Sequence, residues 1–315
     1  MATLFRLIGV LAFFAVAGCS SLFFYPAKPW AQNPTRIGLG YEDVILIHPK
    51  GLRVHGWWLP AVGKPRGTVY FLHGNAQNIS THIMSVNWLP DAGFNVFLLD
   101  YRGYGLSEGK AKFPEVLADI QLGLDWLGKS SRLDGKPLIV FGQSLGASMS
   151  IEVMSEESNQ GKAQCAVFEA AFTGYRDITS DIMKRSWLLW PMRPLVVPFM
   201  PPRKWDPIEN IGAITMPKLV MHSKEDDVIP YKQGEALYDA AAAPKEFQAL
   251  LGQHIEAMRD PSVQKRAVDF FEKRCDVAPR EVMSPVTPSR EQIPAPSLPV
   301  APPVSDSTDS RTLTF

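Results

Sequence analysis

A strand-like apolar run followed by a helix-compatible stretch recurs along the middle of the chain, and this alternation limits the possible folds more than any other feature. The strand-like runs are TVYFLHG, FNVFLLD, PLIVFG, AQCAVFEA and PKLVMH. Helix-compatible stretches include residues 79–89, FPEVLADIQLGLDWLG, LGASMSIEVM and GEALYDAAA. Repetition of a strand and then a helix predicts an α/β fold with a mostly parallel sheet and helices on both faces.

Two further strands precede this pattern. EDVILIHPKG and LRVHGWWLPAV contain strand-like runs on either side of a turn at residues 49–51. Apolar runs separated by proline and glycine predict an antiparallel hairpin.

Length and composition suit one large domain with extensions. The chain has 315 residues, 46% of them hydrophobic, which is enough for a core of a domain of about 250 residues. Lysine plus arginine equals aspartate plus glutamate, at 32 each. The overall charge therefore gives no indication of a nucleic acid or of a strongly acidic partner.

The first 18 residues have the layout of a secretory signal. Arg6 precedes an apolar stretch, residues 7–17, that is shorter than the about 20 residues of a membrane span. Its end, Val-Ala-Gly-Cys, resembles the bacterial lipoprotein box and implies that Cys19 is acylated, with Ser20 directing the protein to the outer membrane. Residues 19–40 are then an anchor and linker to the membrane in the cell envelope. The alternative is a plain signal peptide with an incidental cysteine.

The other end of the chain is rich in proline and serine. Residues 276–315 lack periodic apolar positions, so we predict a disordered tail, with a spacer or cell-wall contact as the alternative. The remaining cysteines are Cys165, in a strand-like run, and Cys275. We expect no disulfide between them, because Cys165 fits the role of a small buried hydrophobe. No spacing of His and Cys indicates a metal site.

Residues 183–207 interrupt the alternation with many Trp, Met, Leu and Pro residues. The prolines exclude one long helix. We interpret the region, about 175–210, as a short lid whose apolar side chains face the substrate or a membrane surface. Ordinary packing across the sheet edge is the alternative.

The sequence GQSLG lies where the run PLIVFG meets the following helix. In such a GxSxG turn the serine, here Ser144, is a candidate nucleophile in a strained backbone conformation. Gly142 and Gly146 leave room for the strand and the helix to approach each other. The helix that begins at Leu145 directs free N–H groups toward the serine, which favours an oxyanion there.

A serine hydroxyl needs a histidine base and a carboxylate that orients the base. Of the six histidines, at positions 48, 55, 73, 82, 222 and 254, only His254 follows the last predicted strand. This placement matches the chain order serine, acid, histidine. The acid candidates are Glu225, Asp226 and Asp227, which directly follow a strand.

Together these motifs resemble the α/β-hydrolase superfamily, in the branch of abhydrolase-domain proteins that is also similar to prolyl-oligopeptidase-type hydrolases. In that branch the strand is followed by HGxxDxxVP, whose Asp is the triad acid. The segment HSKEDDVIP aligns Asp226 with that Asp and Pro230 with the proline, but has Ser223 and Ile229 in place of Gly and Val. The resemblance therefore implies Asp226 as the acid, with Asp227 as the alternative.

The resemblance also includes HGNAQN and DYRGYGLSEG and extends over roughly residues 41–273, within an expected domain of residues 41–275. It implies an α/β-hydrolase fold with about eight strands. It further implies that the backbone N–H groups of Asn75 and Leu145 bind the oxyanion, and that His73 is structural. In the segment DYRGYGLSEG, the resemblance implies a structural role for Tyr101, Arg102, Gly103 and Gly105.

The predicted activity is hydrolysis of small-molecule carboxylic esters by a Ser144, His254 and Asp226 triad, without a cofactor or metal. Serine at the nucleophile position argues against haloalkane dehalogenase and epoxide hydrolase chemistry, for which similar folds use Asp. Alternatives are a serine peptidase, a lipid or thioester acyl hydrolase, and a non-catalytic envelope lipoprotein. The sequence gives no indication of oligomeric state.

Overall fold

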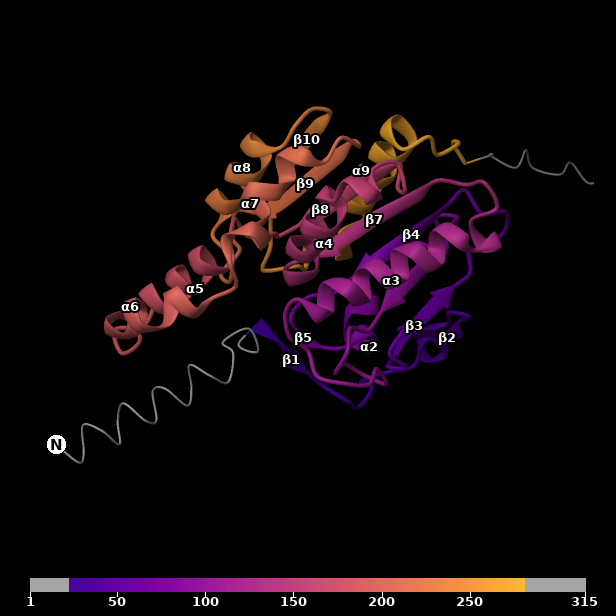
Figure 1. Ribbon diagram of the computed structural model, residues 1–315. Coiled ribbons are helices and arrows are strands. Elements are labelled where there is room, and N and C mark those ends of the chain that lie inside the picture. The colour runs from indigo at the N-terminus through magenta and orange to yellow at the C-terminus, as the bar shows by residue number, and fades with distance from the viewer. Residues whose placement is uncertain (1–22, 281–315) are drawn as a thin grey trace, which may run out of the picture. The chain divides into compact units, whose positions relative to one another are not determined.

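The computed structural model describes residues 23–280 (Figure 1). All of them belong to one structural unit. The predicted signal segment, Cys19 and residues 281–315 of the predicted tail lie outside the described residues.

Eight strands form the main sheet, in the spatial order β10-β9-β8-β7-β4-β6-β3-β2. Neighbours are parallel except for β2 with β3 and β3 with β6, which are antiparallel. The prediction of a mostly parallel sheet that begins with a hairpin is confirmed. The strands are β2 Glu42–Ile47, β3 Arg53–Leu59, β4 Gly67–Leu72, β6 Phe94–Leu99, β7 Leu138–Gln143, β8 Cys165–Glu169, β9 Lys218–Ser223 and β10 Lys245–Leu250. A separate parallel pair joins β1 (Tyr25–Pro26) to β5 (Ala76–Gln77).

Helices cover both faces of the sheet, as predicted. The longer helices are α3 Glu115–Lys129, α4 Leu145–Ser155, α5 Tyr175–Lys184, α8 Tyr231–Ala240 and α9 Pro261–Arg274. Single helical turns are α2 Ile79–His82, α6 Arg193–Val196 and α7 Pro207–Asn210.

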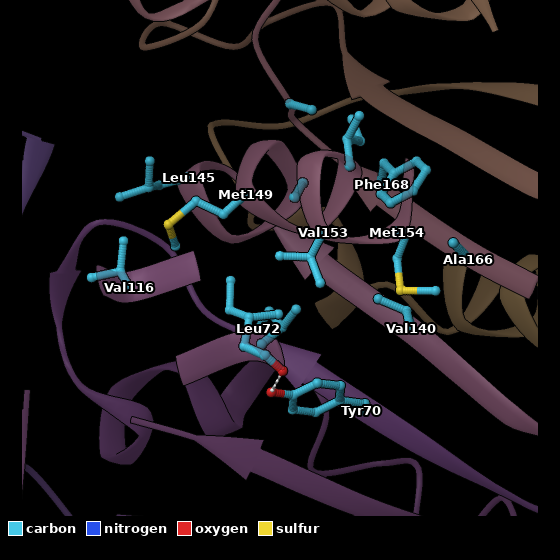
Figure 2. Close-up of a cluster of buried hydrophobic side chains, with 14 of the residues drawn as sticks. Tyr70, Leu72, Val116, Val140, Leu145, Met149, Val153, Met154, Ala166 and Phe168 are labelled. Carbon is cyan, nitrogen blue, oxygen red and sulfur yellow. Dashed lines mark hydrogen bonds between the residues drawn. The ribbon is translucent and has the colours of Figure 1, made fainter. Parts of the chain in front are cut away.

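The hydrophobic core has two layers because both faces of the central strands are buried. In β4, Tyr70 and Leu72 face a layer that includes side chains from α3, α4 and α8 (Figure 2). Val69 and Phe71 face the opposite layer, with side chains from α2 and α9. This explains why the central strands are continuous apolar runs rather than alternating ones. The phenol of Tyr70 donates to the Ile120 carbonyl at 3.0 Å, which satisfies its buried hydroxyl.

Two local predictions differ from the structure. The helix expected over residues 79–89 is one α-helical turn followed by a 3₁₀ turn, Ile83–Ser85, and further turns. Asn87, Pro90 and Gly93 favour turns over a continued helix, which accounts for the difference. Strand β10 was not recognised, because it is a half-buried edge strand with a polar sequence, KEFQAL.

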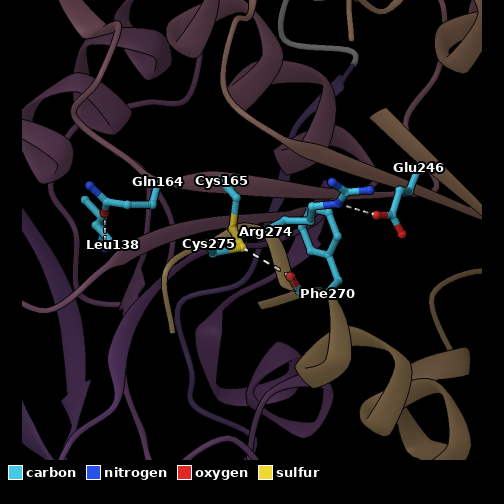
Figure 3. The surroundings of a disulfide bond; sticks show 7 residues. All are labelled: Leu138, Gln164, Cys165, Glu246, Phe270, Arg274 and Cys275. Carbon is cyan, nitrogen blue, oxygen red and sulfur yellow. Dashed lines mark hydrogen bonds and ion pairs between the residues drawn. A yellow bond between two sulfur atoms is a disulfide. The ribbon is translucent and has the colours of Figure 1, made fainter. Parts of the chain in front are cut away.

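Cys165 and Cys275 form a disulfide (Figure 3), so the expectation of no disulfide is wrong. The first residue of β8 lies against the end of α9, with a distance of 5.3 Å between the two Cα atoms. The two cysteines are 110 positions apart. Local sequence patterns do not show such a long-range contact, whereas the parallel sheet brings the last helix back beneath β8.

We expect the disulfide to contribute about 2–4 kcal/mol to stability, because it closes a long loop of the unfolded chain. Reductant should lower the melting temperature of the wild-type protein. The double variant Cys165→Ala/Cys275→Ala should melt at a lower temperature and be insensitive to reductant. Thermal unfolding with and without reductant measures both effects, and a wild-type protein unaffected by complete reduction would contradict the expectation.

Among residues 23–280, no helix is both long enough and apolar enough to cross a bilayer.

Candidate active site

Ser144 lies at the sharp turn between β7 and α4. Its backbone angles, φ 53° and ψ −119°, are in a region that residues other than glycine rarely adopt. A Cβ on Gly142 would lie 2.5 Å from the Cα of Ala147, and one on Gly146 would overlap the Leu72 carbonyl. Glycine is therefore required at both positions for the strand and the helix to meet, as the sequence argument expected.

The structure brings the three predicted triad side chains together. The hydroxyl of Ser144 lies 2.9 Å from Nε2 of His254, and Nδ1 of His254 lies 2.7 Å from Oδ2 of Asp226. With Nδ1–H donating to the carboxylate, Nε2 is free to accept the serine proton. The Asp226 side chain is buried, whereas 14% of the His254 side chain remains accessible.

The loop after β9 distinguishes the two candidate acids. Oδ1 of Asp226 accepts the backbone N–H groups of Val228 and Ile229, at 2.9 and 2.7 Å. Burial alone would raise the pKa of Asp226, but hydrogen bonds from His222 and His254 outweigh it and hold this pKa well below its ordinary value. Asp227 is exposed, and its backbone carbonyl accepts a hydrogen bond from Arg185. The geometry thus favours Asp226 as the partner of His254.

The histidine loop is held by two residues of the acid loop. The Ser223 hydroxyl donates to the carbonyl of Gly252, and the N–H of Gly252 donates to the Glu225 carboxylate at 2.8 Å. Gly252 stands two positions before His254. Ser223, which departs from the family pattern, therefore helps to fix the position of the imidazole.

The predicted oxyanion loop lies next to the serine. A Cβ on Gly74 would lie 3.6 Å from the Cβ of Ser144. The carbonyl of Asn75 accepts the N–H of Tyr25 at 2.9 Å and the hydroxyl of Tyr104 at 2.6 Å, which fixes the peptide plane that follows Asn75. Leu145 is the first residue of α4, where the helix leaves N–H groups without intrahelical partners. Leu145 is thus adjacent to Ser144 in the chain, and the loop that carries Asn75 lies beside the serine.

His73 is fully buried and lies beneath this loop. Its Nδ1–H donates to the carbonyl of Gly74 at 2.8 Å, and the hydroxyl of Tyr101 donates to the carbonyl of His73 at 2.9 Å. Burial lowers the pKa of His73 well below its ordinary value, so the ring is neutral. These contacts fit the structural role expected of His73 and of Tyr101.

Arg102, Gly103 and Gly105 lie in the turn after β6. Arg102 forms an ion pair with the buried carboxylate of Asp119 at 2.6 Å. Gly103 and Gly105 have positive φ angles, 87° and 45°, which side-chain-bearing residues rarely adopt. The turn therefore has the structural features that the resemblance implied.

Sequence reasoning missed a buried polar pair beside the serine. The side-chain amide of Gln143 donates to Oε2 of Glu169 at 2.7 Å, and the N–H of Ser144 donates to the Glu169 carbonyl at 2.8 Å. Burial raises the pKa of Glu169 to about 7. The available signal was weak: Gln143 occupies a variable position of GxSxG, and Glu169 ends the strand next to β7.

Glu169 should make stability depend on pH. Its carboxyl group is protonated in the folded protein at pH values where the unfolded chain has already released the proton. Stability should therefore fall as the pH rises from about 4.5 toward 7, by at most about 3 kcal/mol. Glu169→Gln stays neutral, so its melting temperature relative to wild type should increase between pH 5 and pH 8. The exposed control Glu157→Gln should show no such trend, and an equal difference at both pH values for Glu169→Gln would contradict this prediction.

Comparison with known proteins found relatives over most of the chain. A family model described as serine aminopeptidase, S33 matches residues 63–207, which include Ser144. The uncharacterized protein YfhR of Escherichia coli O157:H7 is 30% identical over 247 residues, 76% of this chain and 81% of that protein. The α/β-hydrolase domain-containing protein WAV2 of Arabidopsis thaliana is 30% identical over 225 residues, 69% of this chain and 72% of that protein.

A solved structure has the same fold. The esterase Pf2001 of Pyrococcus furiosus superimposes with a TM-score of 0.67 at 18% identity, over 80% of this chain and 98% of that structure.

Proposed function

The chain belongs to the α/β-hydrolase superfamily, and on that basis we propose that it is a serine hydrolase that cleaves carboxylic esters through an acyl-enzyme intermediate. The observation that carries the proposal is the continuous hydrogen-bonded chain from Ser144 through His254 to Asp226. A non-catalytic envelope lipoprotein on the same scaffold would not need these three side chains to meet beside a strained serine.

In the proposed reaction, the Ser144 oxygen attacks the ester carbonyl carbon while Nε2 of His254 takes the hydroxyl proton. The N–H groups of Asn75 and Leu145 stabilise the resulting oxyanion. The tetrahedral intermediate collapses, the carbon–oxygen bond to the alcohol breaks, and His254 returns the proton to the leaving alcohol. Water then attacks the acyl-enzyme with His254 again as the base, which releases the acid and restores Ser144. Asp226 keeps the imidazole in the required tautomer throughout.

Two observations bear on the substrate class. The family model that matches the chain is described as a serine aminopeptidase, which favours peptides, whereas the solved structural neighbour is described as an esterase. We favour esters of modest acyl length, because the segment 175–210 is short and its residues 182–205 contain no acidic side chain that could pair with the N-terminal ammonium group of a peptide. A lipid or thioester acyl substrate remains an alternative within the same chemistry.

Rates on p-nitrophenyl esters of increasing acyl length, run beside aminoacyl amides, test the substrate class. The ester proposal requires kcat/KM to be higher for at least one ester than for every amide. Higher values for the amides would replace it with the peptidase alternative.

We also propose that Cys19 is acylated and that the protein is an outer-membrane lipoprotein of the bacterial envelope. The support is the sequence Val-Ala-Gly-Cys at the end of the apolar stretch. The disulfide between Cys165 and Cys275 agrees with an oxidising compartment outside the cytoplasm.

The variant Cys19→Ser should lose incorporation of labelled fatty acid and move from the membrane to the soluble fraction. Cys165 and Cys275 have no free thiol to take up the label, because they are paired in the disulfide. Loss of labelling in Cys19→Ser therefore reports on Cys19. Unchanged labelling and fractionation would exclude lipidation at this residue.

A further inference from the structure

The segment between α5 and α7 leaves large apolar side chains in contact with solvent. Trp187 is 88% exposed, and the other members of the set are between 44% and 64% exposed. The set consists of Trp187, Leu188, Trp190, Met192, Leu195 and Phe199. We call these residues the apolar face. Its exposure argues against ordinary packing across the sheet edge, and large exposed apolar side chains gathered in one short segment indicate an interaction site.

The apolar face is displayed by an ordered segment. Figure 1 shows α5 and α6 projecting from the rest of the unit. Met183 and Met200, on either side of the apolar face, are buried, and Val196 packs against the core. The guanidinium of Arg185 donates to the carbonyls of Asp227 and Val228. The face is therefore fixed to the loop that carries Asp226.

All charged side chains within residues 182–205, the segment that carries the apolar face, are cations. Residues 182–205 contain five cations, Lys184, Arg185, Arg193, Arg203 and Lys204, and no acidic residue, in a chain whose net charge is zero. Asp181 partly neutralises Lys184 at 3.1 Å. Arg193 lies over the ring of Trp190, 4.7 Å from its centroid. Tryptophan beside basic residues is typical of proteins at the surface of an anionic bilayer.

The described chain begins beside α5, the helix that precedes the apolar face in the sequence. The ring of Phe23 packs edge-on against Tyr175, the first residue of α5, with 5.1 Å between centroids. Cys19 precedes Phe23 by four positions in the sequence. An anchor at Cys19 and the apolar face would therefore act on one membrane.

We propose that the apolar face docks on a bilayer that contains anionic phospholipid. The proposal rests on the exposure of its apolar side chains, on the cations among them and on the packing of Phe23 against α5. The aromatic and aliphatic side chains enter the interfacial region, and the surrounding cations contact the lipid phosphates. Docking also brings the Asp226 loop close to the membrane through Arg185. The proposal does not depend on catalysis, so Ser144→Ala should dock as the wild type does.

Fluorescence quenching by brominated lipids tests docking in the full-length protein. Residues 1–22 contain no tryptophan, so insertion of the N-terminal segment by itself cannot quench tryptophan at the apolar face. Vesicles of brominated phosphatidylglycerol and phosphatidylethanolamine should quench wild-type emission. Trp187→Phe/Trp190→Phe keeps apolar rings in place, so it should still sediment with vesicles but lose at least half of the quenching. The control Trp126→Phe, in α3, should keep it.

Charge supplies a second arm of the test. Arg193→Glu/Arg203→Glu/Lys204→Glu should reduce quenching severalfold in vesicles with phosphatidylglycerol, provided that its thermal unfolding matches wild type. Equal quenching in wild type and Trp187→Phe/Trp190→Phe would overturn the proposal. A wild-type dimer that forms without lipid, and that either set of substitutions dissociates, would also overturn the proposal, because the apolar face would then bind a second copy of the chain.

Discussion

Ser144→Ala is expected to abolish covalent labelling by a fluorophosphonate and to lower kcat for ester hydrolysis by about 10⁴-fold or more. The reason is that no other hydroxyl is placed 2.9 Å from Nε2 of His254 among the described residues. Any residual rate would come from the oxyanion-binding N–H groups and from substrate binding, which the substitution leaves in place.

Ser155→Ala is the matched control for this experiment. Ser155 lies at the other end of α4 and donates to the carbonyl of Glu152, away from the triad. It should label and turn over like wild type. Labelling of Ser144→Ala at the wild-type level would remove the serine from the reaction and favour the non-catalytic alternative.

Asp226→Asn is expected to lower kcat by about 10⁴-fold, whereas Asp227→Asn should change it by less than about twofold. In Asp226→Asn, the oxygen of the new side-chain amide can still accept the N–H groups of Val228 and Ile229, so the loop should keep its shape. The NH₂ group of that amide, however, faces Nδ1 of His254 and favours the tautomer that leaves Nε2 protonated. That tautomer cannot accept the serine proton.

Steady-state kinetics on one p-nitrophenyl ester measure this pair of variants, with melting temperatures as a check on folding. The adjacent, exposed Asp227 provides the control for a change of charge in the same loop. A larger loss in Asp227→Asn than in Asp226→Asn would assign the acid to the other carboxylate.

Much of the fold was predictable because its determinants are local. Each central strand is a short, mainly apolar run, and most of these runs are followed by turn-forming residues and a helical pattern, so the parallel order follows from the rule for strand–helix repeats. Edge strand β10 escaped recognition since only Leu250 of its six residues is buried. The pairing of Cys165 with Cys275 could not be predicted, because it depends on how α9 packs against the sheet.

The same distinction applies to the site. Gly142 and Gly146 could be assigned because the collision that each avoids is a property of one turn. The choice between Asp226 and Asp227 needs the path of the loop after β9, in which two backbone N–H groups hold one of the carboxylates. The pairing of Gln143 with Glu169 needs the register between two neighbouring strands. Neither can be derived from spacing along the chain.

The apolar face and the triad are connected through one side chain. Arg185 joins the end of α5 to the carbonyls that follow Asp226. A membrane contact at the apolar face would therefore act next to the loop that orients His254.

In the proposed reaction, Ser144 attacks a carbonyl with His254 as its base. Mass spectrometry of peptides from fluorophosphonate-treated protein tests it most directly. We predict a single adduct on the peptide that contains Ser144, and strong suppression of that adduct in folded His254→Ala. Folded wild-type protein that remains unmodified, or that carries its adduct on a different residue, would exclude Ser144 as the nucleophile.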